Sequence, residues 1–290
     1  MSIIMPVYNG ENTIEDSIES CLNQSEKNFE LIIVDNASTD DTKLKVRKYR
    51  KDKRIKYIYT DLRGRSRARN IGIKSAIGKY LIFLDSDDQF DHDMLNKGCS
   101  FLKDNDTYFG YAVAVEYISK NNSETNLFIP KSGEAYLMLN NQFPINSILF
   151  KNDKLKFFKE NIEHNEDWLF FIENLKGKSI YIDDSFVGGK VFVHGNNTMK
   201  DLSAMISSKL YIRANYNHLF PKNYSIAFDN LKLLMYSSFL FDKQNRYSIN
   251  NHFKKQRFLL KGVKQIPYIN KFIRKKLESK LQVNQYNEVS

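Results

Sequence analysis

The chain of 290 residues contains 42% hydrophobic and 13% aromatic residues, enough for a sizeable core, so intrinsic disorder is not expected. Cys21 and Cys99 are too few for a disulfide framework and lack metal-site spacing, so we expect core thiols of a reduced, cytoplasmic protein. No run of about 20 uncharged apolar residues predicts a membrane-spanning helix, and no signal-peptide pattern is expected at the N-terminus.

The formal net charge of +10 is concentrated near the C-terminus. Residues 243–280 contain twelve lysines and arginines and one acid, Glu278, whereas the rest of the chain is nearly neutral. Any argument from basic charge about an anionic partner therefore applies to this segment alone. The segment has no recognisable nucleic-acid-binding pattern, so nucleic acid is not an expected partner.

The first part of the chain alternates short apolar runs, typical of strands, with segments of helical periodicity. The expected strands are Ser2–Val7, Phe29–Val34, Ile55–Tyr59 and Tyr80–Leu84, and the expected helices are residues 14–22, Thr42–Tyr49 and Arg65–Ala76. This alternation predicts an α/β fold with a mainly parallel sheet flanked by helices. Ligands bind at the carboxyl ends of such strands, which places Asn9, Asp35 and the acids from Asp85 onward at one edge.

The second part is less regular and becomes helical toward the C-terminus. The expected strands are Gly110–Tyr117, Ser147–Phe150 and Lys190–His194, and the expected helices are Glu166–Leu175, Ala204–Tyr216, Ile226–Leu240 and Pro267–Leu281. We therefore expect an α/β domain over residues 1–200 and a C-terminal helical, basic region over residues 201–290.

The segment YLIFLDSDDQFDHDML places five acids directly after a predicted strand. Carboxylates at a strand end suit Mn²⁺ or Mg²⁺, which binds one or two protein carboxylates and completes its shell with substrate phosphates and water. Position favours this role for Asp85 and Asp87, with Asp88 beside them. Asp91 and Asp93 are better placed to begin the next helix. The segment therefore predicts a site for a metal-bound diphosphate substrate.

The glycine patterns of two common nucleotide folds are missing. PVYNGENT follows the first strand, where a dinucleotide fold requires G-x-G-x-x-G, and no P-loop pattern occurs. Asp35 suits contact with a ribose or base, and also suits a turn or helix cap. Arg69, in DLRGRSRARNIG, suits phosphate oxygens, although such a run is also typical of a solvated helix face.

Two acids and the only tryptophan open a predicted helix at Glu166, Asp167 and Trp168. The acids either stabilise the helix dipole or supply a general base that deprotonates an acceptor hydroxyl. His194 follows a predicted strand, where a single histidine is more often structural than a metal ligand. The residues alone leave both alternatives open.

Together, the segments SIIMPVYNGENTIEDSIESCLNQS, FELIIVDNASTDDT, GRSRARNIGI, AIGKYLIFLDSDD and NEDWLFF resemble the bacterial family 2 glycosyltransferases with a GT-A fold, over roughly residues 1–200. The resemblance implies a metal-dependent, inverting enzyme that moves a hexosyl or N-acetylhexosaminyl group from a UDP-sugar. The implied acceptor is a hydroxyl of a glycan, lipid-linked or glycoprotein molecule in cell-surface glycoconjugate synthesis. The alternatives are a catalytically inactive sugar-nucleotide-binding module and an aspartyl phosphatase, which Gln89 in the D-x-D-x-[TV] position disfavours.

The resemblance also implies residue roles at matching positions. Asp167 is the implied catalytic base, and Glu166 contacts the sugar or acceptor. Asp85-Ser86-Asp87 matches the DxD motif, in which Asp87 binds the Mn²⁺ or Mg²⁺ directly and Asp85 faces the metal or ribose. The implied nucleotide-sugar site comprises Pro6, Tyr8, Asn9, Asp35, Arg69, Asp85 and Ser86. His194 completes the metal or phosphate site, whereas Phe192 replaces an arginine that the family often has.

The C-terminal helix has an apolar stripe beside basic residues. Its stripe is Ile269, Ile273, Leu277 and Leu281, with Lys271, Arg274 and Lys275 on the other side. Such a helix either rests on an anionic membrane surface or packs on its own domain or a partner subunit. The family resemblance favours peripheral contact with the inner face of the membrane through residues 243–290. The oligomeric state is left open by the sequence.

Overall fold

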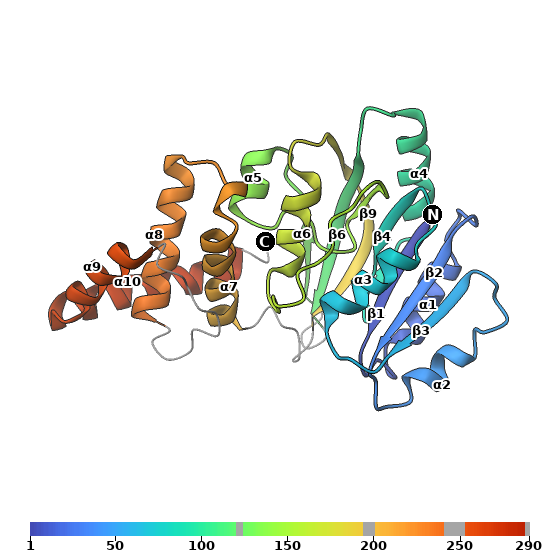
Figure 1. Cartoon of the computed structure of the whole chain (residues 1–290), viewed down its shortest axis with the longest axis horizontal. Helices are drawn as coiled ribbons and strands as arrows, with labels where there is room; N and C mark the ends of the chain where they lie inside the picture. The colour runs from blue at the N-terminus through green and yellow to red at the C-terminus, as the bar shows by residue number, and fades with distance from the viewer. Residues whose placement is uncertain (120–123, 194–200, 241–252, 288–290) are drawn as a thin grey trace. The chain divides into compact units, whose positions relative to one another are not determined.

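The computed structural model describes residues 1–119, 124–193, 201–240 and 253–287 (Figure 1). The chain divides into two compact units, one formed by Met1–Leu137 with Asn141–Gly195 and the other by Met138–Asn140 with Asn196–Ser290. In their described residues, the first unit combines a sheet with helices and the second is helical.

The first unit is built around a mixed sheet of nine strands within the described residues. The strands are β1 (Ser2–Val7), β2 (Glu30–Asn36), β3 (Ile55–Thr60), β4 (Tyr80–Phe83), β5 (Gln89–Phe90), β6 (Gly110–Ser119), β7 (Thr125–Phe128), β8 (Ile148–Lys151) and β9 (Ile180–Val193). Their order is β3-β2-β1-β4-β8-β6-β9-β5, with β7 also paired to β6. The pairs among β1 to β4 and the long β6–β9 pair are parallel, whereas β8 runs antiparallel to β4 and β6. The predicted α/β fold with a mainly parallel sheet is confirmed.

Helices cover both faces of this sheet (Figure 1). They are α1 (Ile14–Leu22), α2 (Thr42–Arg47), α3 (Arg65–Ser75), α4 (Met94–Asp104), α5 (Glu134–Leu139) and α6 (Glu166–Leu175). Alternate residues of a strand point to opposite faces of a sheet. On β2, Leu31 and Ile33 therefore belong to the core cluster that includes buried residues of α1 and α4, whereas Ile32 and Val34 cluster with Ala68 of α3. Burial on both faces explains why β2 is a continuous apolar run.

A glycine sets how closely α3 approaches the sheet. A Cβ atom built on Gly72 would lie 2.3 Å from Cγ2 of Ile4 on β1, closer than any real contact. Because only glycine leaves room for this approach, α3 packs directly over β1 and β2. This packing places the N-terminal part of α3, which carries the arginines, near the carboxyl ends of those strands.

The acids that follow β4 fall into two groups, as the sequence predicts. Helix α4 begins at Met94, with Asp93 at its N-cap position. The Asp93 carboxylate accepts a hydrogen bond from Ser25 Oγ at 2.7 Å, and Asp91 Oδ1 accepts one from the Asp93 backbone N–H at 3.1 Å. Asp91 and Asp93 therefore form the turn into α4, although neither side chain bonds a backbone N–H of the helix's first turn.

The second unit packs its helices around a core of its own. They are α7 (Leu202–Asn215), the short 3₁₀ helix η2 (Asn217–Leu219), α8 (Tyr224–Phe239), α9 (Lys254–Lys264) and α10 (Pro267–Asn287). Arg213 of α7 is buried, pairs with Asp229 of α8 at 2.9 Å, and donates to the carbonyl oxygens of Met138 and Leu139 at 3.3 and 3.1 Å. These bonds explain why residues 138–140 group with the helical unit.

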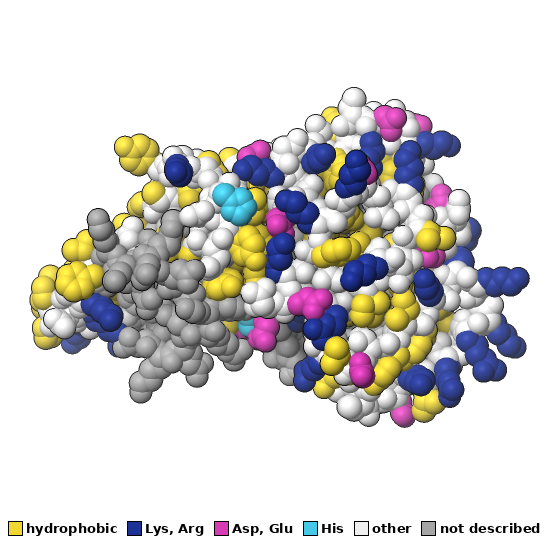
Figure 2. All heavy atoms as spheres, viewed as in Figure 1, with side chains coloured by type: hydrophobic (Ala, Val, Ile, Leu, Met, Phe, Trp, Pro, Cys, Tyr) yellow, Lys and Arg dark blue, Asp and Glu magenta, His cyan; other side chains and the backbone are white. Residues whose placement is uncertain are grey.

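The apolar stripe predicted on the last helix divides between packing and exposure. Ile273 packs against the core of the second unit and Leu277 is buried in it, so the alternative of packing on its own domain holds for these two residues. Ile269 is 38% exposed, and the side chain of Leu281 lies outside the described residues. Figure 2 shows apolar and basic side chains together on the part of the unit that holds α9 and α10. Among the helices of the described ranges, none has the length and apolar composition needed to cross a bilayer.

Candidate active site

Three parallel strands bring their carboxyl ends to one edge of the sheet. Val7 of β1 pairs with Asp35 of β2, and β4 lies on the other side of β1, with the Leu84 N–H donating to the Ile4 carbonyl at 3.0 Å. The loop that begins with Tyr8 and Asn9, the end of β2, and the acids from Asp85 onward therefore lie along this edge. The predicted placement of these residues is confirmed.

Asn9 ties the loops that follow β1 and β2. Its backbone is left-handed, with φ of +50°. Its Oδ1 accepts from the Thr39 N–H at 2.8 Å, and its own N–H donates to Ser38 Oγ at 2.9 Å. The adjacent Gly10 N–H donates to Thr42 Oγ1 at 2.8 Å. Asparagine tolerates this backbone conformation better than most residues, so both its backbone and its amide suit the junction.

Aromatic and small residues form the rest of this edge near β1. Pro6 is buried within β1, whereas Tyr8 is 36% exposed. The guanidinium carbon of Arg63, from the loop after β3, lies 3.9 Å from the centre of the Tyr8 ring. A Cβ atom on Gly10 would lie 3.4 Å from Ser86 Oγ, which puts the start of the DxD segment beside the loop after β1.

Asp35 is buried, and both of its oxygens have partners within the chain. Oδ1 accepts from the Ser38 N–H at 2.9 Å, and Oδ2 accepts from the Tyr57 hydroxyl on β3 at 2.5 Å. Burial, and then the hydrogen bond to Asp35, raise the pKa of Tyr57, so the hydroxyl keeps its proton and donates. The turn-forming interpretation of Asp35 is therefore correct, and contact with a nucleotide stays a prediction.

Arg69 links the end of β4 to the start of α6. Its side chain is 2% exposed. One terminal nitrogen donates to Asp85 Oδ1 at 2.9 Å and the other to Glu166 Oε1 at 2.9 Å. Arg67, on the same helix, instead pairs with Glu160 at the surface at 2.8 Å. The structure thus brings Arg69, Asp85 and Glu166 together and leaves Arg67 apart.

The opposite charges in this cluster keep one another ionised. Burial alone would lower the pKa of Arg69, but Asp85 and Glu166 outweigh it, and the pKa is raised. Burial would likewise raise the pKa of Asp85, but Arg69 and then Arg65 hold it below its usual value. The Asp85 carboxylate is therefore ionised at neutral pH, which a metal ligand or a nucleotide contact requires.

Asp167 is the second residue of α6 and follows Glu166 directly. Its Oδ1 accepts from the Trp168 N–H at 2.7 Å, and its Oδ2 accepts from Asn141 Nδ2 at 2.9 Å. Burial, and then the negative charge of Glu166, raise its pKa to about 6, against the opposing effect of Arg69. A carboxylate with a pKa in this range is suited to accept a proton near neutral pH.

The carboxylates at the end of β4 fit a metal ion that arrives with a diphosphate. Asp85 and Asp87 are both partly exposed, whereas Asp88 is buried and accepts from the Phe192 N–H at 3.1 Å. No group of three or more His, Cys, Asp or Glu side chains in the described ranges is arranged to hold a metal ion by itself. Two carboxylates suffice for Mg²⁺ or Mn²⁺ when substrate phosphates supply further ligands. His194, the third predicted ligand, lies outside the described residues.

Two residues beside the acids are not suggested by the sequence pattern. Burial, and then the charges of Asp88 and Asp167, raise the pKa of Tyr117 on β6. Asn141 donates a hydrogen bond to Asp167 Oδ2. Neither residue lies in a recognisable motif. The one signal in the sequence is that Tyr117 ends the expected strand Gly110–Tyr117, which corresponds to β6.

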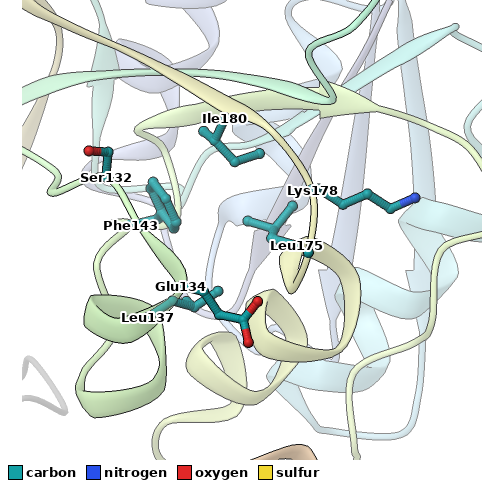
Figure 3. Close-up of a pocket in the computed structure, with 9 residues that line it drawn as sticks. Ser132, Glu134, Leu137, Phe143, Leu175, Lys178 and Ile180 are labelled. Atoms are coloured by element: carbon teal, nitrogen blue, oxygen red, sulfur yellow. The ribbon is translucent and has the colours of Figure 1, made fainter.

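A separate hollow lies at the other end of α6 (Figure 3). It has a volume of about 100 Å³ and is lined in part by Glu134, Phe143, Leu175 and Lys178. Asp167 is at the start of α6 and Leu175 at its end, roughly 12 Å apart at the usual rise of an α-helix. This hollow is therefore distinct from the edge that holds the acids.

Comparison with known proteins identifies the family. Residues 2–173 match the family described as Glycosyl transferase family 2. The chain belongs to this family. An uncharacterized glycosyltransferase of Haemophilus influenzae is 38% identical over 227 residues, which cover 73% of this chain and 88% of that protein. The Escherichia coli UDP-Glc:alpha-D-GlcNAc-diphosphoundecaprenol beta-1,3-glucosyltransferase WfgD is 34% identical over 184 residues, which cover 62% of this chain and 71% of that protein.

The fold is also found in a solved structure. S. aureus TarS 1-349 in complex with UDP-GlcNAc matches with a TM-score of 0.66 and 18% identity, over 94% of this chain and 83% of that one. This likeness confirms the GT-A fold of this family 2 glycosyltransferase. Three relatives from Rickettsia species are longer, and the chain covers only 39%, 29% and 34% of their lengths.

Proposed function

We propose that this family 2 glycosyltransferase moves a hexosyl or N-acetylhexosaminyl group from a UDP-sugar to an acceptor hydroxyl, with inversion at the anomeric carbon. The acceptor is a glycan, lipid-linked or glycoprotein molecule of bacterial cell-surface glycoconjugate synthesis. The observation that carries this proposal is the Asp85–Arg69–Glu166 cluster, which joins the DxD segment to the helix start that holds Asp167. The names of WfgD and of the TarS complex support the donor and acceptor classes.

The residues divide between the donor and the acceptor. The loops of Tyr8 and Asn9, with Pro6, Asp35 and Ser86, form the nucleotide side. Asp85 and Asp87, completed by His194, would hold Mn²⁺ or Mg²⁺, whose chemistry when bound is to neutralise charge on a diphosphate. Arg69 lies between Asp85 and Glu166 and holds both side chains in place by donating a hydrogen bond to each.

The chemical step needs one proton acceptor from the chain. Asp167 accepts the proton of the acceptor hydroxyl while the oxygen of that hydroxyl forms a bond to C1 of the sugar. The bond from C1 to the diphosphate oxygen breaks on the opposite face, so the configuration inverts and the nucleoside diphosphate leaves. Glu166 contacts the sugar or the acceptor, and fixed positions of both substrates supply much of the remaining acceleration.

A donor panel with a metal-removal arm tests this function. UDP-glucose, UDP-galactose, UDP-GlcNAc and UDP-GalNAc are each incubated with the protein and Mn²⁺, where water takes the place of the acceptor hydroxyl at C1, and released UDP is measured. We expect release from one donor, and a loss of at least about 100-fold with EDTA or in Asp87→Ala, because the diphosphate charge is then unbalanced. Asp91→Ala, in the turn into α4, is the matched control and should keep full activity. Release that is unaffected by EDTA would contradict the metal role, and no release from any donor would favour an inactive binding module.

We also propose that residues 201–290 form a separate helical domain that contacts the cytoplasmic face of the membrane through residues 243–290. The contact surface is the outer face of α9 and α10, defined by Phe258, Leu259, Tyr268 and Phe272, which are 77%, 68%, 83% and 61% exposed. The exposed Lys261, Lys271, Lys275 and Lys276 lie on the same two helices. Exposed aromatic residues beside lysines suit the interface of an anionic bilayer.

Vesicle binding tests the outer face. The protein should co-sediment with vesicles of phosphatidylcholine and phosphatidylglycerol and not with phosphatidylcholine alone. The double variant Phe258→Ser/Phe272→Ser should reduce binding by about tenfold or more, because two exposed aromatic side chains are lost. Tyr224→Ser/Phe228→Ser removes two aromatic residues of α8 that are 95% and 71% exposed, and it should bind like the wild type. Equal binding by both double variants would rule out this face as the contact surface.

A further inference from the structure

Asn141 and the backbone of α6 each donate a hydrogen bond to one oxygen of Asp167. Asn141 Nδ2 donates to Asp167 Oδ2 at 2.9 Å, while Oδ1 of Asp167 accepts from the Trp168 N–H. The other end of the Asn141 amide accepts from the Phe143 N–H at 3.2 Å. In a flipped amide, the Asn141 oxygen would face the Asp167 carboxylate and its NH₂ group would face the Phe143 N–H. The two hydrogen bonds together therefore determine that the NH₂ group meets Asp167.

Neighbouring contacts hold Asn141 in place against α6. The Trp168 indole N–H donates to the Leu137 carbonyl at 2.7 Å, and Trp168 is 1% exposed. On the other side of Asn141, the ring of Phe143 packs edge-on against that of Phe171 at 5.7 Å. The chain on both sides of Asn141 is therefore attached to α6, and the donor to Asp167 is held in position before any substrate binds.

We propose that Asn141 is a positioning residue that holds one oxygen of Asp167 so that the carboxylate faces the acceptor hydroxyl. This inference rests on the proposed role of Asp167 as the base. An amide has a donor for the carboxylate and no proton to lose, so it orients the base without competing for the proton that the base accepts. Asn141 has no role implied by the family resemblance.

The charges around Asp167 make a neutral donor important. Glu166, on the same helix, is a negatively charged neighbour of Asp167, and Tyr117 on β6 is a neutral one. Arg69 and Arg65 of α3 are positively charged and lower the pKa of Asp167. The net result is a carboxyl group whose pKa is already raised to about 6. A hydrogen bond to the ionised form lowers a carboxyl pKa, so loss of the Asn141 donor should raise it further.

Direct titration of Asp167 tests this inference without a known acceptor. The full chain is labelled with ¹³C-carboxyl aspartate, and the Asp167 signal is assigned by its loss in Asp167→Asn. We expect Asn141→Ala to raise the pKa of Asp167 by about one unit, since one hydrogen bond to the ionised form is lost. Asn141→Asp should raise it further, because a like charge replaces the donor. Asn140→Ala is the matched control: Asn140 is exposed, bonds Lys209 instead, and should leave the titration unchanged.

Activity separates this role from a structural one. With the most active donor of the panel and Mn²⁺, the acidic limb of UDP release should move to higher pH in Asn141→Ala, with kcat reduced by about tenfold and the donor KM unchanged. Thermal unfolding confirms that each variant is folded. A titration of Asp167 that is the same in Asn141→Ala and the wild type would overturn the inference and leave the base role intact. Full turnover by Asp167→Asn would instead overturn the base role.

Discussion

Replacing Asp167 by Asn is expected to abolish sugar transfer while leaving nucleotide binding near that of the wild type. The amide keeps the size of the side chain and can still accept from the Asn141 or Trp168 N–H groups, but it cannot take the acceptor proton. Loss of a general base costs about 100-fold to 10,000-fold in rate. Released UDP measures the rate, and calorimetric titration with UDP and Mn²⁺ measures binding.

The same substitution at an exposed aspartate elsewhere in the fold shows whether the loss of activity is specific to Asp167. Asp184→Asn changes an exposed acid on β9 and should keep both activity and UDP binding. The Asp167 carboxylate lies near Glu166, so its removal also relieves a repulsion, and we expect no loss of thermal stability. Turnover by Asp167→Asn within a few-fold of the wild type would show that another group is the base.

Replacing Arg69 by Met should cause the largest loss of stability among the site residues. Arg69 is 2% exposed and its charge compensates both Asp85 and Glu166. Removing one partner of a buried ion pair such as Arg69–Glu166 costs about 3–5 kcal/mol, because Arg65, at 3.4 Å from Glu166, compensates the remaining charge only in part. Activity should also fall, since Asp85 and Glu166 lose the group that holds them. Chemical denaturation measures the free energy of unfolding.

The same substitution at Arg67 is the matched control. Arg67 is on the same helix, and its pair with Glu160 is at the surface, where both side chains are more than a third exposed. Such pairs contribute about 0–1 kcal/mol, so Arg67→Met should change the unfolding free energy little. If Arg69→Met and Arg67→Met lowered it equally, the Arg69 cluster would not have the proposed role in stability.

Local patterns were sufficient to predict the first four strands and the edge at which the acids lie, whereas β5 and β7 were not predicted and β9 begins ten residues before the expected strand at Lys190. β1, β2 and β4 are built on short apolar runs, β3 mixes apolar and polar residues, and alternation of strands with helices implies parallel order. The division of the acidic segment was also predictable, because Asp85 directly follows a buried strand while Asp93 directly precedes a helical pattern. These predictions depend on residues close together in the chain.

The partners of the site residues could not be predicted in the same way. Arg69 and Glu166 are 97 positions apart, and Asn141 and Asp167 are 26 apart. No local pattern distinguishes Arg69, which is buried between two acids, from Arg67, which lies at the surface. The direction of each side chain depends on how α3 and α6 pack against the sheet.

The sequence by itself determined the α/β class, the family, and the positions of the acids at the strand ends. Periodicity and turn residues act over a few positions, so they can be read along the chain. Only the tertiary structure decided that Arg69 joins Asp85 to Glu166, that Asn141 meets Asp167, and that Leu277 is buried while Phe272 is exposed. These outcomes depend on burial and on pairing between distant segments, because a charge is compensated only by what the fold places beside it.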